Sequence, residues 1–221
     1  MSRGGAISLL LSALALAPSA GAADLHGSVA LTGRSADTAT LGDAVVFFRP
    51  AAPVKRRTPP RNASMEMLHK ALVPHVLAIK EGTSVEFPNL DPILHNLFST
   101  TPGNSFDLGL YRAGHEKSVT FDHPGLVRVY CNVHHEMFAY ILVLDTPYFT
   151  GVNADGSFTL HGLPAGGGNL VVWHPRATVW REKLVIPDAA PVQVKLRIVR
   201  GGIPTHFNKY GKPYAGKGSG Y

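Results

Sequence analysis

The chain has 221 residues, with 21 Lys and Arg against 15 Asp and Glu, 11 His and a single cysteine. One cysteine excludes an internal disulfide, and a net charge of +6 concentrated in a linker and a tail does not indicate nucleic-acid binding. After the N-terminal region, no stretch approaches the ~20 apolar residues that span a bilayer, so stable membrane insertion is not expected.

The first 22 residues are typical of a secretory signal peptide. Arg3 gives a positive start, residues 6–17 form a short apolar run, and Ala20-Gly21-Ala22 provides a cleavage site of small residues. The alternative, a buried N-terminal helix, has no capping residue. We therefore expect an exported, periplasmic protein that begins near Ala23 and contains one large or two small domains.

Short β-branched and aromatic runs, separated by Gly, Pro and Asp, make up most of the remaining chain and predict an all-β fold. Glu81-Gly82-Thr83 is expected to close a hairpin, and residues 64–72 are the one candidate for a short helix. The expected strands are 44–48, 76–79, 84–87, 94–99, 117–121, 126–131, 139–144, 158–160, 170–173 and 192–199.

Two segments have the composition of connections rather than strands. Residues 51–64 are rich in proline and basic residues and predict a linker, and residues 201–221 predict a flexible basic tail. The composition changes again near Pro147, and Asp155-Gly156 and the glycine run 166–168 indicate turns between further strands.

The single cysteine lies in the densest cluster of metal-ligand residue types in the sequence. Cys131 ends an apolar strand on the same face as Val127 and Val129, and His134 and Met137 follow within seven residues. Thiolate, imidazole and thioether together favour copper, and a trigonal site with a weak axial methionine needs a second histidine. His95 is the candidate from another strand, and Asn96 follows it.

The segments SVEFPNLDPILHNLFS, NSFDLGLY and VYCNVHHEMFAYILVLDTPYF resemble the cupredoxins, with amicyanin-type ligand spacing, and more narrowly the bacterial cupredoxin-type "methylamine utilization" proteins. The resemblance covers roughly residues 73–149. It implies a Greek-key β-sandwich that binds one type 1 copper, with Asn96 tying the two ligand loops together. Its implied ligands are His95, Cys131, His134 and Met137.

The ligand loop also departs from the amicyanin pattern. Val133 and His135 stand where amicyanin-type loops carry prolines, so the adjacent His134 and His135 remain alternative ligands, with the spacing favouring His134. We assign His135 to the solvent.

Electron transfer is the function that this ligand set predicts. Ligands held on strands suit both copper oxidation states, and no catalytic group is evident elsewhere in the sequence. We therefore expect a non-enzymatic carrier with redox donor and acceptor proteins as partners. A nucleophilic Cys131 is the enzymatic alternative, disfavoured by its place inside a sandwich. The family resemblance implies that His134 is the port for electrons, with Leu90, Ile93 and Phe138 as an apolar docking patch.

The C-terminal region is similar to a second type of β-sandwich, the transthyretin-like or carboxypeptidase-regulatory fold. Residues 151–199 provide too few strands for that sandwich alone, so we expect residues 23–50 to supply its opening strands, with the copper module at 65–146 inserted between them and 147–200. In the competing interpretation, residues 25–50 are the first cupredoxin strands.

Two further functions remain as alternatives. One is a periplasmic protein that stores or delivers copper without redox turnover, and the other is a non-redox sandwich that binds carbohydrate or protein. The sequence does not determine the redox pathway, the reduction potential or the oligomeric state.

Overall fold

The computed structural model describes residues 22–33, 36, 39–53, 62–199 and 205–214. In this part of the chain the predicted all-β fold is confirmed: strands are joined by loops and by the short 3-10 helix η2 (Leu41–Asp43), and there is no α-helix. No helix within these ranges has the length and apolar character needed to cross a membrane. The expected signal peptide lies outside the described residues, apart from Ala22.

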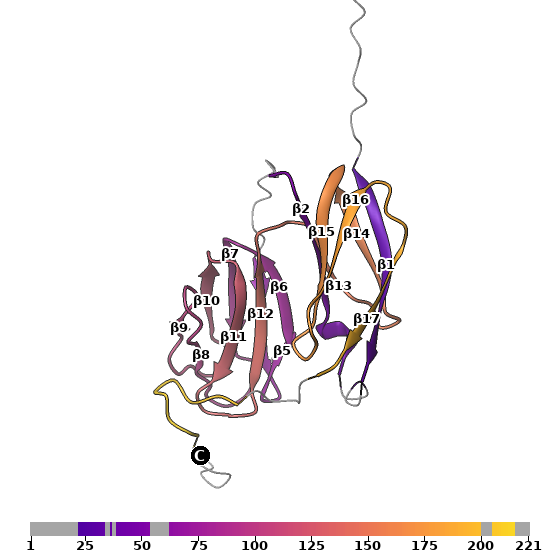
Figure 1. Ribbon diagram of the computed structural model, residues 1–221. Helices are drawn as coiled ribbons and strands as arrows, with labels where there is room; N and C mark the ends of the chain where they lie inside the picture. Colours follow the sequence, from indigo (N-terminus) through magenta and orange to yellow (C-terminus); the bar gives the residue numbers. More distant parts are fainter. Residues whose placement is uncertain (1–21, 34–35, 37–38, 54–61, 200–204, 215–221) are drawn as a thin grey trace, which may run out of the picture.

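Two β-sandwiches lie side by side (Figure 1). The first, here called the central sandwich, has one sheet in the order β10-β7-β3, a second in the order β6-β12-β11-β8-β9, and a separate β4-β5 hairpin. Its strands are β3 (Ala63–Ser64), β4 (Glu66–Leu68), β5 (Ala71–Val73), β6 (Val76–Lys80), β7 (Thr83–Pro88), β8 (Leu97–Ser99), β9 (Phe106–Asp107), β10 (Glu116–Phe121), β11 (Gly125–Cys131) and β12 (Phe138–Leu144).

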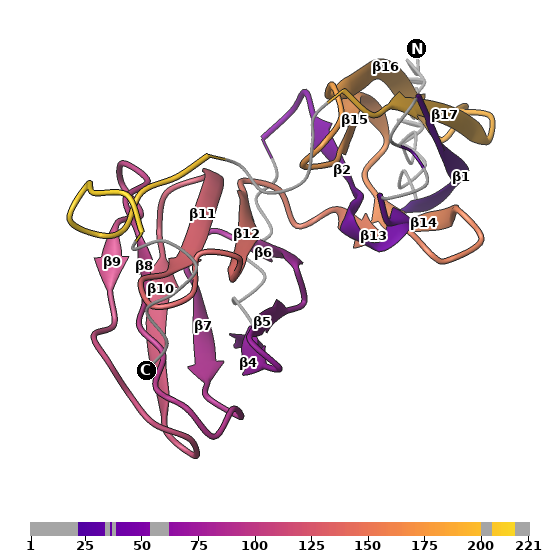
Figure 2. The ribbon, with the colours of Figure 1, turned by 90° about the horizontal axis from the view of Figure 1, so that it is seen from below.

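The second, the flanking sandwich, is built from both ends of the described chain. Its sheets have the orders β14-β1-β17 and β13-β2-β15-β16, and Phe47 of β2 lies opposite Val171 of β15. The chain leaves this sandwich after β2 and returns at β13 (Figure 2). Its strands are β1 (Ala23–Thr32), β2 (Val45–Pro50), β13 (Phe149–Gly151), β14 (Ser157–Leu163), β15 (Gly166–Trp173), β16 (Trp180–Ile186) and β17 (Val192–Arg197).

Strands with one core-facing side alternate between buried and more exposed residues, as the two-residue period of a strand requires. β7 and β17 follow this pattern along their whole length. β12 does not, because six consecutive residues after Phe138 are buried. A strand that is apolar on both faces must be covered on both faces.

The second cover of β12 is the flanking sandwich. Ala139, Ile141 and Val143 face the core of the central sandwich, whereas Tyr140 and Leu142 pack against Val45, Phe47, Val171 and Trp173. β2 and β15 alternate in the same way, with Phe48 and Val172 in the core of the flanking sandwich. The two sandwiches therefore share an apolar interface made by sheet faces.

The helix expected at residues 64–72 is wrong. This segment forms β3, β4 and β5, with Met65 and Met67 buried on one side and Glu66 between them partly exposed. His69 and Lys70 close the β4–β5 hairpin with φ angles of 54° and 58°. Positive φ at both central residues is the geometry of a tight hairpin turn, which these two residue types do not signal in a sequence.

The hairpin expected at Glu81-Gly82-Thr83 is also wrong, although both flanking strands exist. β6 pairs in parallel with β12, and β7 pairs antiparallel with β10, so the turn carries the chain from one sheet to the other. Glu81 donates its main-chain N–H to Leu144, and Gly82 donates to Phe121. These bonds join the turn to both sheets.

An ion pair beside the apolar interface predicts a pH-dependent part of the stability. The His75 Nδ1 lies 3.0 Å from the Asp43 Oδ2. Burial raises the pKa of the Asp43 carboxyl, but the hydrogen bond and charge of His75, together with a hydrogen bond from Thr40, lower it by more, so the pKa lies below its usual 3.8. A carboxylate with a depressed pKa stabilises the folded state above pH 3.8 and loses this contribution as the pH falls through the folded pKa.

Asp43→Asn is therefore expected to lower the free energy of unfolding at pH 5 by up to about 1 kcal/mol, the scale of a partly exposed ion pair. The difference from the wild type should shrink as the pH is lowered below 3.8. Denaturant midpoints at several pH values between 5 and 2.5 measure it. A difference that stays constant over this range would contradict the role of the Asp43 charge.

Candidate metal centre

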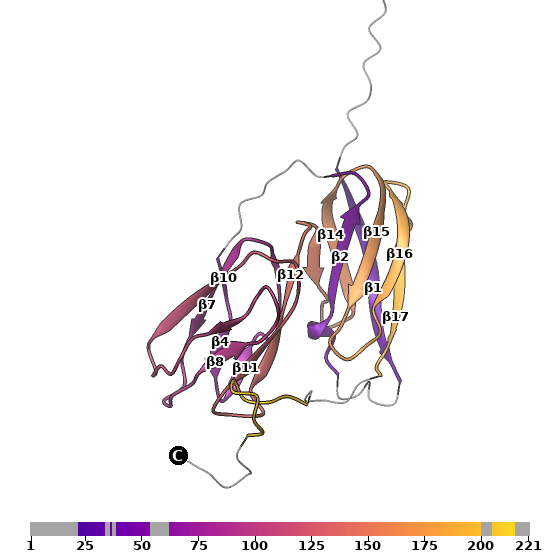
Figure 3. The ribbon, with the colours of Figure 1, turned by 60° about the vertical axis from the view of Figure 1, so that its left-hand side comes forward.

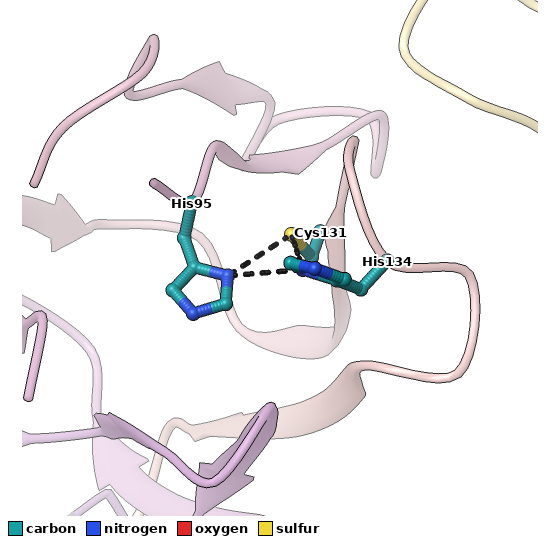
Figure 4. A group of neighbouring side chains, drawn as sticks. All are labelled: His95, Cys131 and His134. Carbon is teal, nitrogen blue, oxygen red and sulfur yellow. Dashed lines mark hydrogen bonds between the residues drawn. The ribbon is translucent and has the colours of Figure 1, made fainter. Parts of the chain in front are cut away.

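Three side chains with metal-binding atoms meet at one end of the central sandwich (Figure 4). Cys131 is the last residue of β11, His134 lies in the loop between β11 and β12, and His95 lies between β7 and β8. The two loops are joined directly, since Asn132 donates its N–H to the main-chain oxygen of Asn96 at 2.8 Å. The β-sandwich thus brings together residues that are 36 positions apart.

The three donor atoms form a nearly regular triangle. The Cys131 Sγ lies 3.7 Å from the His95 Nδ1 and 3.8 Å from the His134 Nδ1, and the two nitrogens are 3.2 Å apart. A triangle with these sides has a point about 2.1 Å from each corner, which is close to the ~2.0–2.3 Å of metal–nitrogen and metal–sulfur bonds. The arrangement therefore fits a single metal ion in the plane of its donors.

The surroundings of Cys131 favour its thiolate. Burial raises the pKa of the thiol, but the His95 ring and the main-chain N–H groups of Asn96 and Val133 hydrogen-bond the sulfur and lower it by more. The N–H of His134 adds to this effect. A thiolate is the form of cysteine that binds metals.

The ring nitrogen of His95 that faces away from Cys131 is hydrogen-bonded to the carboxylate of Asp91. This nitrogen, Nε2, lies 2.9 Å from the Asp91 Oδ2, and both side chains are buried. With the Nε2 proton donated to Asp91, Nδ1 is the nitrogen that faces the sulfur and His134, and it would bind a metal ion once it has lost its own proton. Burial lowers the pKa of His95, but its hydrogen bonds to Cys131 and Asp91 raise it by more.

Asp91 is itself fixed by the β4–β5 turn. Its carboxylate accepts the main-chain N–H groups of His69 at 2.5 Å and Lys70 at 2.8 Å. The side chain of Asn89 braces the same loop, because it donates to the main-chain oxygens of Ile93 and Tyr111 and accepts the N–H of Asp91. The hairpin that replaces the expected helix thus helps to position His95.

Of the two adjacent histidines, His134 faces the sulfur. The pKa of His134 is lowered by burial and then by the nearby His95, which favours the neutral form that binds metals. The His135 side chain is exposed on one side and stacks on His206 with a centroid distance of 4.6 Å. The structure therefore places His134 in the donor triangle.

The other predicted site residues lie around the triangle. Met137 is buried in the same core as Cys131, and its main-chain oxygen accepts the Cys131 N–H at 3.0 Å. The Asn96 side chain donates to Asp107 at 2.6 Å, so the link between the ligand loops runs through its main chain. Leu90 and Ile93 are exposed, whereas Phe138 is half-buried between His75 and Tyr140.

Further exposed apolar side chains lie near the ligands. Leu94 and Leu110 stand next to the His95–Tyr111 bridge, and Val133 precedes His134. These residues, Asp91 and Asn89 were not identified from the sequence. An aspartate four positions before His95 was the available signal for Asp91, but in a loop that spacing has no fixed geometry.

No protein-family model and no curated protein matches the chain. Several solved structures resemble part of it. A purple cupredoxin from Nitrosopumilus maritimus is 22% identical over 37% of this chain and 99% of its own, with a TM-score of 0.34. An oxidized mutant of amicyanin is 16% identical over 37% of this chain and 81% of its own, with a TM-score of 0.35.

The copper-containing nitrite reductase from Thermus scotoductus is a third similar structure. It is 21% identical over 53% of this chain, with a TM-score of 0.38, and the match covers 28% of the reductase.

Proposed function

We propose that the chain is an exported type 1 copper protein that carries single electrons between redox partner proteins. The observation that carries the proposal is the donor triangle of His95, Cys131 and His134, whose three atoms surround one point at bonding distance. Its chemistry fits copper, because one thiolate and two imidazoles form the trigonal plane of a blue-copper site. We propose Met137, which is buried in the same core as Cys131, as a fourth residue that would hold the copper.

A copper ion held here would supply a one-electron couple between Cu(I) and Cu(II). The protein's part is to hold the donors in one arrangement for both states. Cys131 is fixed at the end of a strand in the hydrogen-bonded ladder, and the Asp91 carboxylate fixes the orientation of the His95 ring. Buried apolar side chains around the sulfur exclude water, so little has to rearrange when the charge changes.

The same geometry supports transfer rather than substrate turnover. His134 is the least buried of the three ligands, which makes it our candidate for the route to a partner. Val133, which precedes His134, and Leu90, Ile93 and Leu94, which precede His95, are exposed apolar side chains on the two ligand loops. Such side chains suit a weak and transient protein contact. We accordingly propose a non-enzymatic carrier.

Three finer proposals rest on the sequence patterns. The signal-peptide pattern of residues 1–22 supports a periplasmic location. The segment resemblances support a relation of the central sandwich to the "methylamine utilization" type and of the flanking sandwich to the carboxypeptidase-regulatory type. The domain boundaries that these patterns give are 65–146 for the copper module, with 23–50 and 147–200 as the two parts of the second sandwich. The pairing of β3 (Ala63–Ser64) with β7 extends the copper module by two residues.

Electron exchange separates this function from copper storage or delivery. The copper-loaded chain is expected to give a reversible one-electron wave in voltammetry, rapid electron self-exchange between its reduced and oxidised forms, and slow loss of copper to a chelator. Slow self-exchange together with ready copper transfer would indicate a copper-handling protein. A carbohydrate-binding role finds less support, because Trp173 is buried against Tyr140 and is not free to stack on a sugar.

A further inference from the structure

The described part of the C-terminal tail lies against the metal-binding end of the central sandwich. Residues 205–214, here called the strap, follow β17 of the flanking sandwich but pack on the other sandwich, beside β8, β9 and β11 (Figures 2 and 3). The Lys- and Gly-rich sequence of residues 201–221 predicts a flexible tail, yet the strap makes several specific contacts beside the metal-binding residues.

The first group of contacts holds the loop that carries Cys131 and His134. The Tyr214 hydroxyl donates to the main-chain oxygen of Cys131 at 2.9 Å. The main-chain N–H of Lys209 donates to the Asn132 Oδ1 at 3.1 Å. The first bond ends on the last residue of β11, and the second ends on the residue that follows it in the ligand loop.

The second group is an aromatic stack that spans the same loop. The His206 ring lies between Tyr130 and His135, with centroid distances of 4.1 Å and 4.6 Å and interplanar angles of 14° and 1°. Tyr214 meets His135 edge-on at 5.0 Å. Tyr130 precedes Cys131 and His135 follows His134, so the His206 ring joins the two ends of the ligand segment.

The third contact reaches the other ligand loop. The Lys209 Nζ lies 2.7 Å from the Asp107 Oδ2, and the Asp107 Oδ1 accepts the Asn96 side-chain N–H at 2.6 Å. Asn96 is the residue after His95 and also receives the N–H of Asn132. The strap therefore contacts the loop after Cys131 directly and reaches the loop of His95 through Asp107 of β9.

We propose that the strap is a clamp that keeps the metal-binding loops in their closed arrangement, with His206 and Tyr214 as its positioning residues. The proposal deepens the function proposed above and rests on it for its consequence, which is slow copper release. Its structural part does not depend on copper, because the contacts to residues 130–135 do not involve the three donor atoms.

The test compares two full-length variants with matched controls. Tyr214→Phe removes one hydroxyl and its bond to Cys131, and Tyr148→Phe makes the same change in the flanking sandwich, away from the strap. His206→Ala removes the stacked ring, with His123→Ala as the control at an exposed histidine. Amide hydrogen exchange of residues 132–136 is measured in the metal-free protein, and the rate of copper loss to excess chelator is measured in the loaded protein.

Tyr214→Phe is expected to accelerate loop exchange and copper loss about fivefold, the factor that one ordinary hydrogen bond supplies. For His206→Ala we expect roughly tenfold, because two ring contacts are lost. Amides of β12 and both controls should keep wild-type rates. Unchanged loop exchange, or equal acceleration in β12, would overturn the clamp. If the wild type takes up no copper, the proposed function fails, and loop exchange alone decides the clamp.

Discussion

Asp91→Ala is expected to weaken copper binding by about 10- to 100-fold, the usual cost of removing the group that orients a metal-binding histidine. The Asp91 carboxylate accepts a hydrogen bond from the Nε2–H of His95 and thereby directs the Nδ1 at the Cys131 sulfur. Without it, the buried His95 ring loses its only described carboxylate partner and can rotate or change tautomer.

The copper affinity is measured by competition with a chelator of known strength. Asp122→Ala, at an exposed aspartate, is the control and should bind copper like the wild type. Because Asp91 also accepts two main-chain N–H groups, Asp91→Asn serves as a milder variant that keeps the shape of the side chain, and an intermediate affinity is expected. An affinity within twofold of the wild type for both variants would refute the positioning role.

Phe48→Ala is expected to lower the free energy of unfolding of the flanking sandwich by about 3–5 kcal/mol, the range for truncating a fully buried phenylalanine. Phe48 is completely buried on β2, in a core that also contains Leu170 and Val172 of β15. The effect would follow from the topology, in which a strand that precedes the central sandwich completes the core of the flanking one.

Denaturation followed by tryptophan fluorescence measures this effect selectively, because Trp173 and Trp180, the two tryptophans of the sequence, both lie in the flanking sandwich. Phe207→Ala is the matched control: its side chain is 54% exposed, and the same truncation should cost less than about 0.5 kcal/mol. A loss below 1 kcal/mol for Phe48→Ala, or equal losses for both variants, would show that β2 is not part of that core.

The sequence was sufficient to predict the all-β class and the residues of the donor triangle. Cys131 and His134 could be found because their spacing lies within one strand and one loop, where sequence distance limits spatial distance. The apolar run 139–144 was predicted as a strand, but the sequence did not show why both of its faces are apolar. The packing of Tyr140 and Leu142 on the flanking sandwich explains it.

The structural features that the sequence did not predict depend on long-range pairing. The turn at Gly82 has the same local signature whether its strands pair with each other or join different sheets. The bond from Asp91 to His95 requires the hairpin turn at His69 and Lys70, where no glycine or asparagine indicates a positive φ. The strap is held by single rings and polar groups, so its sequence has no apolar periodicity from which its position could be predicted.

The central claim is that Cys131 binds copper together with His95 and His134. The most direct measurement is the visible absorption spectrum of the chain after addition of Cu(II), recorded beside Cys131→Ser. We predict an intense thiolate-to-copper charge-transfer band in the wild type and its loss in the variant. A colourless wild type, or copper bound equally well without the thiol, would contradict the claim.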